Sequence, residues 1–216
     1  AHLTPSFEIS EITLSAPAVP VFENAFAAFG RGAIVRTENG PMAVEDLLPG
    51  DRIMTVHHGR QTLMWRGAIT MQPRDTFGHM TRITTDAMGY TRPSTDLVLG
   101  PSARILYKNP AIKVLTGATE ALVPIKDFED GSQVIALHPV SAVQCFQLGF
   151  AKHTCVNVNG LDVETLHPGL PHLLKLRANE AMHFANLFPH MRNASAFGPL
   201  AAPRIRKDDI DLVLAA

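Results

Sequence analysis

Residues 28–56 have the sequence AFGRGAIVRTENGPMAVEDLLPGDRIMTV, and the fold prediction starts from them. Two runs typical of β-strands, Ala33–Thr37 and Arg52–Val56, flank the centre of this stretch. After the first run, Glu38-Asn39-Gly40-Pro41 predicts a turn, because Asn-Gly adopts positive φ at low cost. Val44–Leu48 predicts a short acidic helical step, which Pro49-Gly50-Asp51 ends. The stretch therefore predicts strand, turn, short helical step and strand in close succession.

The chain keeps this β character from Ala33 to about Gly169. Short apolar and β-branched runs alternate with turn residues, and no strand–helix–strand repeat appears. This pattern predicts a sandwich or a closed all-β architecture. Besides Ala33–Thr37, the expected strands are Arg52–His57, Thr62–Thr70, Thr81–Thr85, Asp96–Leu99, Arg104–Lys108, Ala121–Pro124, Val134–Leu137, Ala142–Phe150 and Thr154–Val158.

The two flanks of this β region differ from it. Residues 1–27 predict a leader and linker, in which Phe7–Leu14 is an expected edge strand and Ala16–Pro20 is stiffened by proline. Residues 170–216 predict a helical tail with one helix over Pro171–Phe188 and a last helix over Asp208–Leu214, capped by Asp208. Apolar residues recur at helical spacing along the first of these helices, namely Leu174, Ala178, Ala181, Ala185 and Phe188. We expect this stripe to pack on the β region; binding a partner helix is the alternative.

Composition limits the possible partners. The chain has 216 residues, of which 19 are basic and 20 acidic, and its net charge is −1. Near-neutral charge argues against a nucleic-acid surface built on bulk charge. No apolar run approaches the ~20 residues of a membrane helix, and the first residues lack a signal-peptide pattern. No glycine-rich phosphate-binding motif is present, so no nucleotide cofactor is expected. We therefore predict neither a nucleic-acid nor a membrane partner, and leave the cellular compartment open.

Five groups of residues follow one another in an order that is informative as a set. The opening Ala28-Phe29-Gly30-Arg31-Gly32-Ala33, with the Val-Glu-Asp-Leu and Pro-Gly-Asp motifs after it, is followed by Gln61–Gly67, Ser94–Leu106, His153–Gly160 and Val163–Gly169. The set resembles the Hint domain superfamily, the fold shared by Hedgehog autoprocessing domains and inteins, and is most similar to a bacterial branch of it. The resemblance implies a mostly β protein: a Hint-like all-β domain over residues 28–169 and a short helical C-terminal tail over residues 170–216.

The resemblance also implies which positions would carry chemistry. In Hint domains a cysteine thiol attacks the preceding peptide carbonyl and leaves a thioester. A histidine, three residues after a threonine or serine, helps the amide nitrogen to leave. The nucleophile position is Ala28 here, the threonine or serine position is Gly100, and the histidine position is Ala103. None of these three side chains can attack a carbonyl or transfer a proton.

The end of the matched region departs from the family in the same way. Inteins end in a His-Asn pair whose asparagine cyclises, and the corresponding residues here are Glu164 and Thr165. His153 alone stands where the family often has a histidine. We therefore treat His153, Glu164 and Thr165 as possible remnants of a site. For His153, the alternative is a buried structural histidine with satisfied hydrogen bonds.

These departures lead to three hypotheses. The first is a Hint protein with a degenerate site, which acts as a binding or structural module and is not an enzyme. The second is an active self-cleaving domain, with its own N-terminal segment as substrate, captured as an engineered Cys-to-Ala and His-to-Ala knockout. The natural residues at positions 28 and 103 distinguish these two. The third, a hydrolase acting on another molecule, ranks last because no Ser-His-Asp motif is visible.

Other residues that suggest chemistry have simpler explanations. The histidines His57, His58, His79, His138, His167 and His172 show no spacing typical of metal ligands, so neither a metal nor another cofactor is expected. We expect Cys145 and Cys155 to be buried strand residues. Asp46 and Asp51 are expected to stabilise turns, although they could form an acid–base pair. Trp65 is expected in the core, the alternative being a ligand platform.

Overall fold

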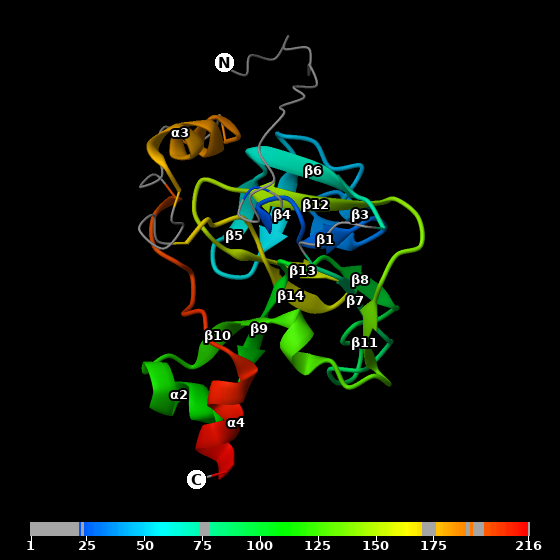
Figure 1. Cartoon of the computed structure of the whole chain (residues 1–216), viewed down its shortest axis with the longest axis vertical. Helices are drawn as coiled ribbons and strands as arrows, with labels where there is room; N and C mark the ends of the chain where they lie inside the picture. Colours follow the sequence, from blue (N-terminus) through cyan, green and yellow to red (C-terminus); the bar gives the residue numbers. More distant parts are fainter. Residues whose placement is uncertain are drawn as a thin grey trace.

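A computed structural model describes residues 22, 24–73, 78–169, 176–188, 191 and 197–215 of the chain. These residues form fourteen strands in two antiparallel sheets, with short helices at the periphery (Figure 1). The mostly β prediction is therefore confirmed. The expected leader elements Phe7–Leu14 and Ala16–Pro20 lie outside the described residues, as does the first part of the helix expected at Pro171–Phe188.

The first sheet brings the start of the domain into its centre. Its strand order is β11-β7-β8-β1-β12-β6, so the two-residue strand β1 (Phe29–Gly30) lies between β8 (Leu97–Leu99) and β12 (Val143–Gly149). Phe29 pairs with Leu99 on one side and with Phe146 on the other. The remaining strands are β6 (Trp65–Met71), β7 (Met80–Ile83) and β11 (Val134–Leu137).

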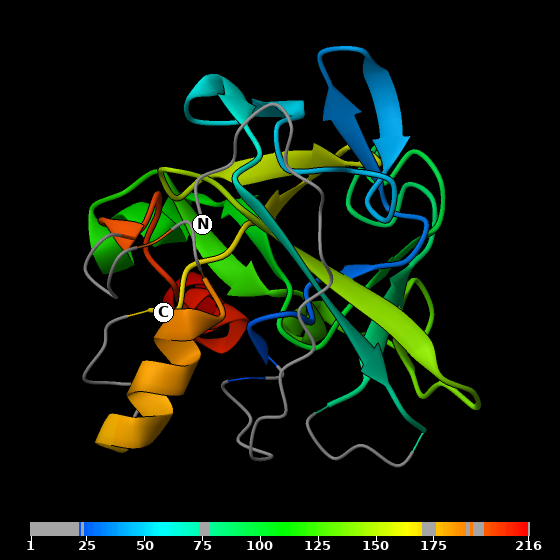
Figure 2. The ribbon, with the colours of Figure 1, turned by 90° about the horizontal axis from the view of Figure 1, so that it is seen from above.

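The second sheet has the order β10-β9-β14-β13-β2-β4-β5, and β3 pairs with β2. Its two-residue β2–β3 turn at Glu38-Asn39 puts Gly40 at a φ of 109°, as the Asn-Gly pair predicts, and the hairpin projects from the body (Figure 2). The strands are β2 (Ile34–Thr37), β3 (Gly40–Ala43), β4 (Arg52–Thr55), β5 (Gly59–Thr62), β9 (Arg104–Lys108), β10 (Glu120–Pro124), β13 (Cys155–Val158) and β14 (Leu161–Glu164).

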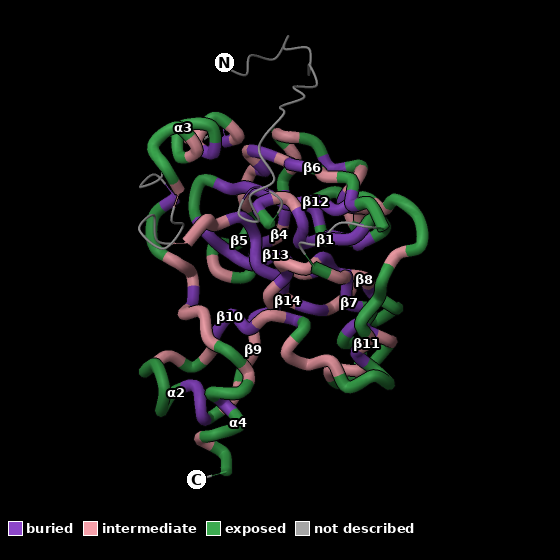
Figure 3. The backbone as a smooth tube through the Cα atoms, viewed as in Figure 1, coloured by how far each residue is buried: buried purple, intermediate pink, exposed green. Residues whose placement is uncertain are grey.

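Inward-facing residues of both sheets form one main hydrophobic core. Phe29, Ile53, Leu99 and Val156 are among its fully buried members, and buried residues gather in the central strands while exposed ones lie at the periphery (Figure 3). Along β2 and β4, buried positions alternate with exposed or half-buried ones. A side chain on a strand faces the opposite side from its neighbours, so this alternation fixes which face is covered. Removing this apolar area from water supplies the main driving force for folding.

Helices cover the ends of the β region. Helix α2 (Pro110–Thr116) packs on α4 (Lys207–Ala215) at the C-terminal end, and α3 (Ala178–Asn186) lies at the other end (Figure 1). A 3₁₀ turn, η1 (Ile125–Phe128), follows β10.

Four details of the sequence prediction are wrong. Val44–Asp46 forms a hydrogen-bonded turn rather than a helical step, because the Asp46 N–H donates to Ala43 O and the chain turns at once into the next strand. Within the described residues, the first tail helix is limited to α3. Its buried residue is Phe184, whereas Ala178 and Ala181 of the expected stripe are exposed. Asp208 does not cap α4, which begins one residue earlier, at Lys207.

Candidate functional site

The peptide between Ala27 and Ala28 is held by the strands on both sides of it. The Ala28 N–H donates to Phe146 O at 3.1 Å, and Ala27 O accepts from the Ser102 N–H at 3.0 Å. The Gly100 N–H donates to Ala28 O at 2.8 Å. These bonds arise because β1 is inserted between β8 and β12. The structure thus places the expected nucleophile position and the expected threonine or serine position in direct contact.

Gly100 and Ala103 place no side-chain group that could transfer a proton beside this peptide. A Cβ atom built on Gly100 would lie 2.2 Å from Ala27 O, so a side chain there would require the backbone to move. Ala103 is 1% exposed, and its N–H donates to Gly100 O at 3.1 Å. One backbone N–H polarises the Ala27 carbonyl, but the methyl groups of Ala28 and Ala103 supply neither nucleophile nor acid.

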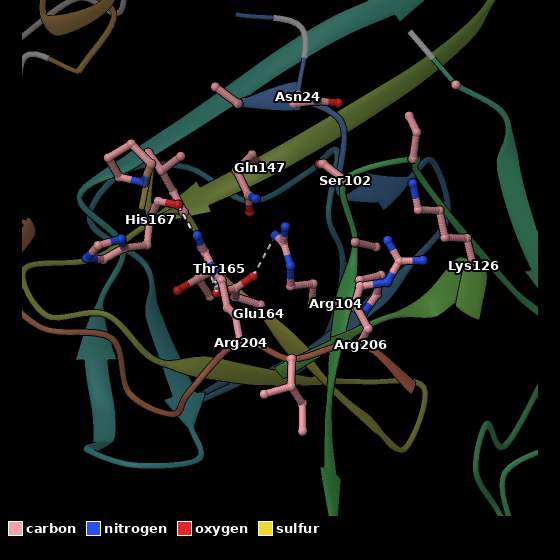
Figure 4. A pocket seen from close by; sticks show the side chains of 18 of the residues that line it. Asn24, Ser102, Arg104, Lys126, Gln147, Glu164, Thr165, His167, Arg204 and Arg206 are labelled. Atoms are coloured by element: carbon pink, nitrogen blue, oxygen red, sulfur yellow. Dashed lines mark hydrogen bonds and ion pairs between the residues drawn. The ribbon is translucent and has the colours of Figure 1, made fainter. Parts of the chain in front are cut away.

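A cavity of about 690 Å³ opens beside the peptide. Ser102 and Ala103 line it on one side, and Glu164 and Thr165 line it on another (Figure 4). The loop between β8 and β9 supplies the first pair, and the end of β14 supplies the second. Residues near both ends of the matched sequence therefore share one cavity.

Glu164 lies at the floor of this cavity, with its side chain 4% exposed, among three basic side chains. Its Oε1 accepts from Arg204 Nε at 2.8 Å, and its Oε2 accepts from Arg104 Nη1 at 3.2 Å. His153 Nε2 is 3.3 Å from Oε1. Burial alone would raise the pKa of Glu164, but His153, Arg204 and Arg104 together hold that pKa below its usual value. Glu164 is therefore an ionised, structurally engaged carboxylate.

His153 and Thr165 are also engaged in structural contacts. His153 Nδ1 accepts from the Ala201 N–H at 2.9 Å, which places the ring proton on Nε2, toward Glu164. The His153 side chain is fully buried, and its Nε2 lies at ion-pair distance from Glu164 without hydrogen-bond geometry. Thr165 Oγ1 donates to Thr154 O at 2.7 Å. Neither side chain reaches the Ala27–Ala28 peptide through a hydrogen bond in the described structure.

Four residues of the site were not singled out from the sequence. Gln147 from β12 is 6% exposed, and Ser102, Arg104 and Arg204 line the same cavity. A polar residue at an inward position of β12 was the available signal for Gln147, since inward strand positions are usually apolar. Arg204 had no such signal, because the tail reaches Glu164 only in three dimensions.

The two cysteines are buried strand residues, as expected. Cys145 pairs with Gly30 across the β1–β12 ladder and packs in an apolar cluster with Ala27, Met71 and Met80. Its Sγ lies 3.4 Å from Met71 Sδ, and burial raises its pKa to about 12. Burial also raises the pKa of Cys155. Both groups are therefore thiols rather than thiolates near neutral pH.

Three other side chains have structural partners. His57 Nε2 is 3.2 Å from Glu120 Oε1, and His79 Nε2 is 2.8 Å from Glu129 Oε1. Asp51 Oδ2 accepts from the Leu48 N–H at 2.7 Å, which is the expected turn bond.

Trp65 is 9% exposed and packs against Phe26 and Phe188, so the prediction of a core tryptophan is confirmed. Within the described ranges, no group of three or more His, Cys, Asp or Glu side chains is placed to hold a metal ion. Over the same part of the chain, no helix combines the length and apolar character needed to cross a membrane.

The fold and this site can now be compared with known proteins. No curated protein sequence matches the chain. Among solved structures, it is similar to the bacterial intein-like domain from Clostridium thermocellum, at 10% identity and a TM-score of 0.46 over 65% of this chain and 99% of that one. It is also similar to a splice-inactive variant of the AceL NrdHF class 3 split intein, at 15% identity and a TM-score of 0.44 over 64% and 97% of the two chains.

A family model supplies the decisive match. The model of the Hint domain family, Hint_2, matches residues 27–170, which is two thirds of the 216 residues. The matched range begins at the Ala27–Ala28 peptide and ends just after the Glu164 and Thr165 positions. The chain therefore belongs to the Hint domain family.

Proposed function

We propose that this chain is a Hint protein that does not process itself and acts as a non-catalytic binding or structural module. The observation that carries the proposal is the alanine at position 28, next to the carbonyl that a nucleophile would have to attack. Covalent autoprocessing needs a side-chain nucleophile at that atom, and a methyl group offers none.

The surroundings of position 28 support the same proposal. Gly100 lies so close to Ala27 O that no side chain fits between them, and Ala103 has no proton to give. Cys145 is the thiol on the neighbouring strand, but it faces Met71 Sδ in an apolar cluster and has a raised pKa. A protonated thiol is a weak nucleophile.

The alternative is an active self-cleaving domain in which cysteine and histidine occupy positions 28 and 103. One observation favours keeping this alternative. Two backbone hydrogen bonds, from the Ala28 N–H to Phe146 O and from the Ser102 N–H to Ala27 O, hold the Ala27–Ala28 peptide beside an open cavity, as such a reaction would require. In that case residues 1–27 would be the end of the released segment.

Intact mass measured on the full chain tests the proposal. We expect the parent protein to keep its full mass with and without dithiothreitol. In Ala28→Cys/Ala103→His, a thiol at position 28 could attack the carbonyl of residue 27, with the amide nitrogen leaving as an amine and a thioester forming. Dithiothreitol would then release residues 1–27. Ala151→Cys, which adds an exposed thiol elsewhere, is the matched control.

The outcomes separate the hypotheses. A parent protein that keeps its full mass supports the proposal. If only the double variant is cleaved, the fold can still support the reaction once the two side chains are present. Spontaneous cleavage of the parent between Ala27 and Ala28 would overturn the proposal. Cleavage of the control would show that any added thiol suffices, so that the double variant's result would say nothing about position 28.

A further inference from the structure

The cavity beside the Ala27–Ala28 peptide is lined by four cationic and two anionic side chains. The cations are Arg104, Lys126, Arg204 and Arg206, and the anions are Glu164 and Asp209. When Asp127, which pairs with Arg206 from outside the lining, is counted as well, the site keeps an excess of one positive charge, whereas the whole chain has a net charge of −1. A concave, partly desolvated site with an excess of one sign of charge concentrates ligands of the opposite charge.

Two of these cations are fully engaged, and two are not. Arg206 makes a bidentate pair with Asp127, at 2.6 and 2.7 Å, and Arg204 binds both Glu164 and the His167 carbonyl. Arg104 uses Nη1 for Glu164. Lys126 is exposed and makes no ion pair with any described residue. Arg104 and Lys126 therefore have donors left for a ligand.

Neutral donors complete the site. Ser102 Oγ is buried and has no hydrogen-bond partner among the described residues. Gln147 Oε1 accepts from the Leu148 N–H at 2.9 Å, which leaves its amide group as a donor. Figure 4 shows Gln147 directed into the cavity, with Arg104 and Glu164 opposite it. The Ser102 hydroxyl is thus a buried donor without a partner, and such groups are rarely left unsatisfied without a ligand or water to receive the bond.

We infer that this cavity binds a small oxyanion, a carboxylate or a phosphate, with charge from Arg104 and Lys126 and hydrogen bonds from Ser102 and Gln147. The acceptors of Glu164 are already covered by basic groups, so they do not favour a cation. The inference deepens the proposed module function and rests on it, because it names the class of ligand that a non-catalytic binding module would take in this cavity.

An NMR titration of the full-length ¹⁵N-labelled protein at low ionic strength tests the inference. The probes are inorganic phosphate, acetate and, as the uncharged control, acetamide. We expect saturable shifts of the Gln147 side-chain amide and of the Ser102 and Arg104 backbone amides with phosphate or acetate, but not with acetamide. The anion with the lower dissociation constant shows whether the site prefers a phosphate group or a carboxylate group.

Variants sharpen the result. Lys126→Gln should weaken binding about tenfold, since hydrogen bonds to charged groups are among the stronger ones. Gln147→Met keeps the shape of the side chain but removes its amide group, and Ser102→Ala removes the buried hydroxyl without changing charge; both should weaken the binding. Lys152→Gln, which removes an exposed charge elsewhere, should bind as the parent does.

Three results would overturn the inference: no saturable shift with either anion, equal shifts with acetamide, or Lys152→Gln weakening binding as much as Lys126→Gln. Intact mass on the same samples separates this inference from the proposed function. A chain that binds but cleaves itself retains the site and overturns only the module proposal. A chain that stays intact and does not bind overturns only the oxyanion site.

Discussion

At the scale of single residues, the three small side chains around the Ala27–Ala28 peptide act together. Gly100 allows the chain after β8 to approach the backbone of Ala27 and Ala28 within hydrogen-bond distance, and the two alanines are buried in the main core beside it. Placing a threonine at position 100 would push against Ala27 O at 2.2 Å and displace the carbonyl. A threonine at position 100 therefore requires a backbone adjustment, whereas the changes at positions 28 and 103 leave Gly100 as it is.

His167 is a second residue with a consequence that can be measured. Its Nδ1 accepts from the Gly169 N–H at 3.0 Å, and its Nε2 lies 3.0 Å from Gly198 O, so the neutral ring has both its bonds. Burial is the main reason that its pKa falls to about 4, and the nearby charge of Arg204 acts in the same direction, while the bond to Gly198 O and the charge of Glu164 act against it. Protonation therefore favours the unfolded state.

This shift predicts a loss of stability on mild acidification. The unfolded chain takes up the His167 proton near pH 6.5, whereas the folded chain does so only near pH 4, so the stabilisation is present above pH 6.5 and lost as the pH falls. Since the ring is half-buried, we expect its contribution to the free energy of unfolding to fall by about 1–2 kcal/mol between pH 7 and 5. Urea unfolding followed by Trp65 fluorescence measures it.

The control for this prediction is a matched pair of variants. His167→Gln should flatten the pH dependence between pH 7 and 5, and His138→Gln, at an exposed position, should leave it unchanged. Carboxylates with lowered pKa values, such as Asp130 and Glu164, lose their contributions to the free energy of unfolding only at a pH below this range. If His167→Gln kept the full slope, another group would be responsible for it.

The sequence predicted where the site lies in the chain, but not which polar side chains surround it. Alignment with family motifs predicted positions 28, 100 and 103, and the structure brings these positions together because β1 pairs with β8 and β12. The polar groups that face the cavity were not predicted. Gln147 and Arg104 lie in strands, where the sequence shows alternation but not which partner each face meets. Arg204 comes from a tail segment that no local pattern connects to β14.

At the scale of elements, strands with a run of apolar or β-branched residues were predictable, and strands without one were not. The β9 and β11 bounds agree with the expected runs, because several apolar or β-branched residues define each strand. Strand β1 has two residues, and β3 contains Gly40 and Pro41, which reduce β propensity. Both exist because neighbouring strands supply their hydrogen bonds, a tertiary effect that no local pattern reveals.

Helix α2 illustrates the same point and gives an element-scale prediction. It has only seven residues, but Asn109 Oδ1 accepts from the Ala111 N–H at 2.9 Å, Pro110 occupies the first turn, and Gly117 ends the helix at a φ of 78°. Asn-Pro is also typical of a turn, so the sequence alone does not identify a helix here. The helix persists because Ala111 and Ile112 pack against Ile210 of α4.

We expect Asn109→Ala to lower the free energy of unfolding by about 1 kcal/mol, because the Ala111 N–H in the first turn of the helix loses its hydrogen-bond acceptor. Asn109→Asp should be nearly neutral, since aspartate caps equally well and places a negative charge at the positive end of the helix dipole. Urea midpoints of the three proteins measure the difference. Equal loss in both variants would show that the amide group of Asn109, and not the cap oxygen, is what matters.

At the scale of the whole molecule, the segment after residue 196 is joined to the β-sheets at several points. The Leu122 N–H donates to Pro203 O at 2.8 Å, and the Ile205 N–H donates to Leu122 O at 3.2 Å, so this segment extends the edge at β10. Ala202 is buried with Leu106, Leu122 and Cys155. Arg204 lies between these contacts and reaches Glu164 beside the cavity. The cavity is thus built jointly by the β region and the tail.

The Glu164–Arg204 pair therefore measures how strongly the tail and the β region depend on each other. Glu164→Gln leaves Arg204 near an uncharged amide, and we expect it to lower the free energy of unfolding by about 3 kcal/mol, as for one partner of a buried ion pair. Arg204→Met should cost slightly less, since Arg104 and His153 still face the carboxylate. The double variant should cost about 2 kcal/mol less than the sum of the single changes.

Urea unfolding of the four proteins of this cycle, combined with hydrogen exchange of α4, gives the measurement. Coupling of about 2 kcal/mol, with α4 exchanging at the free energy of global unfolding, would mean that the tail folds as one unit with the sheets. Arg104→Met serves as the comparison, because it removes a Glu164 partner that lies within the β region itself. Additive effects, with α4 opening long before β9 and β10, would contradict a jointly built cavity and would make the tail an independent attachment.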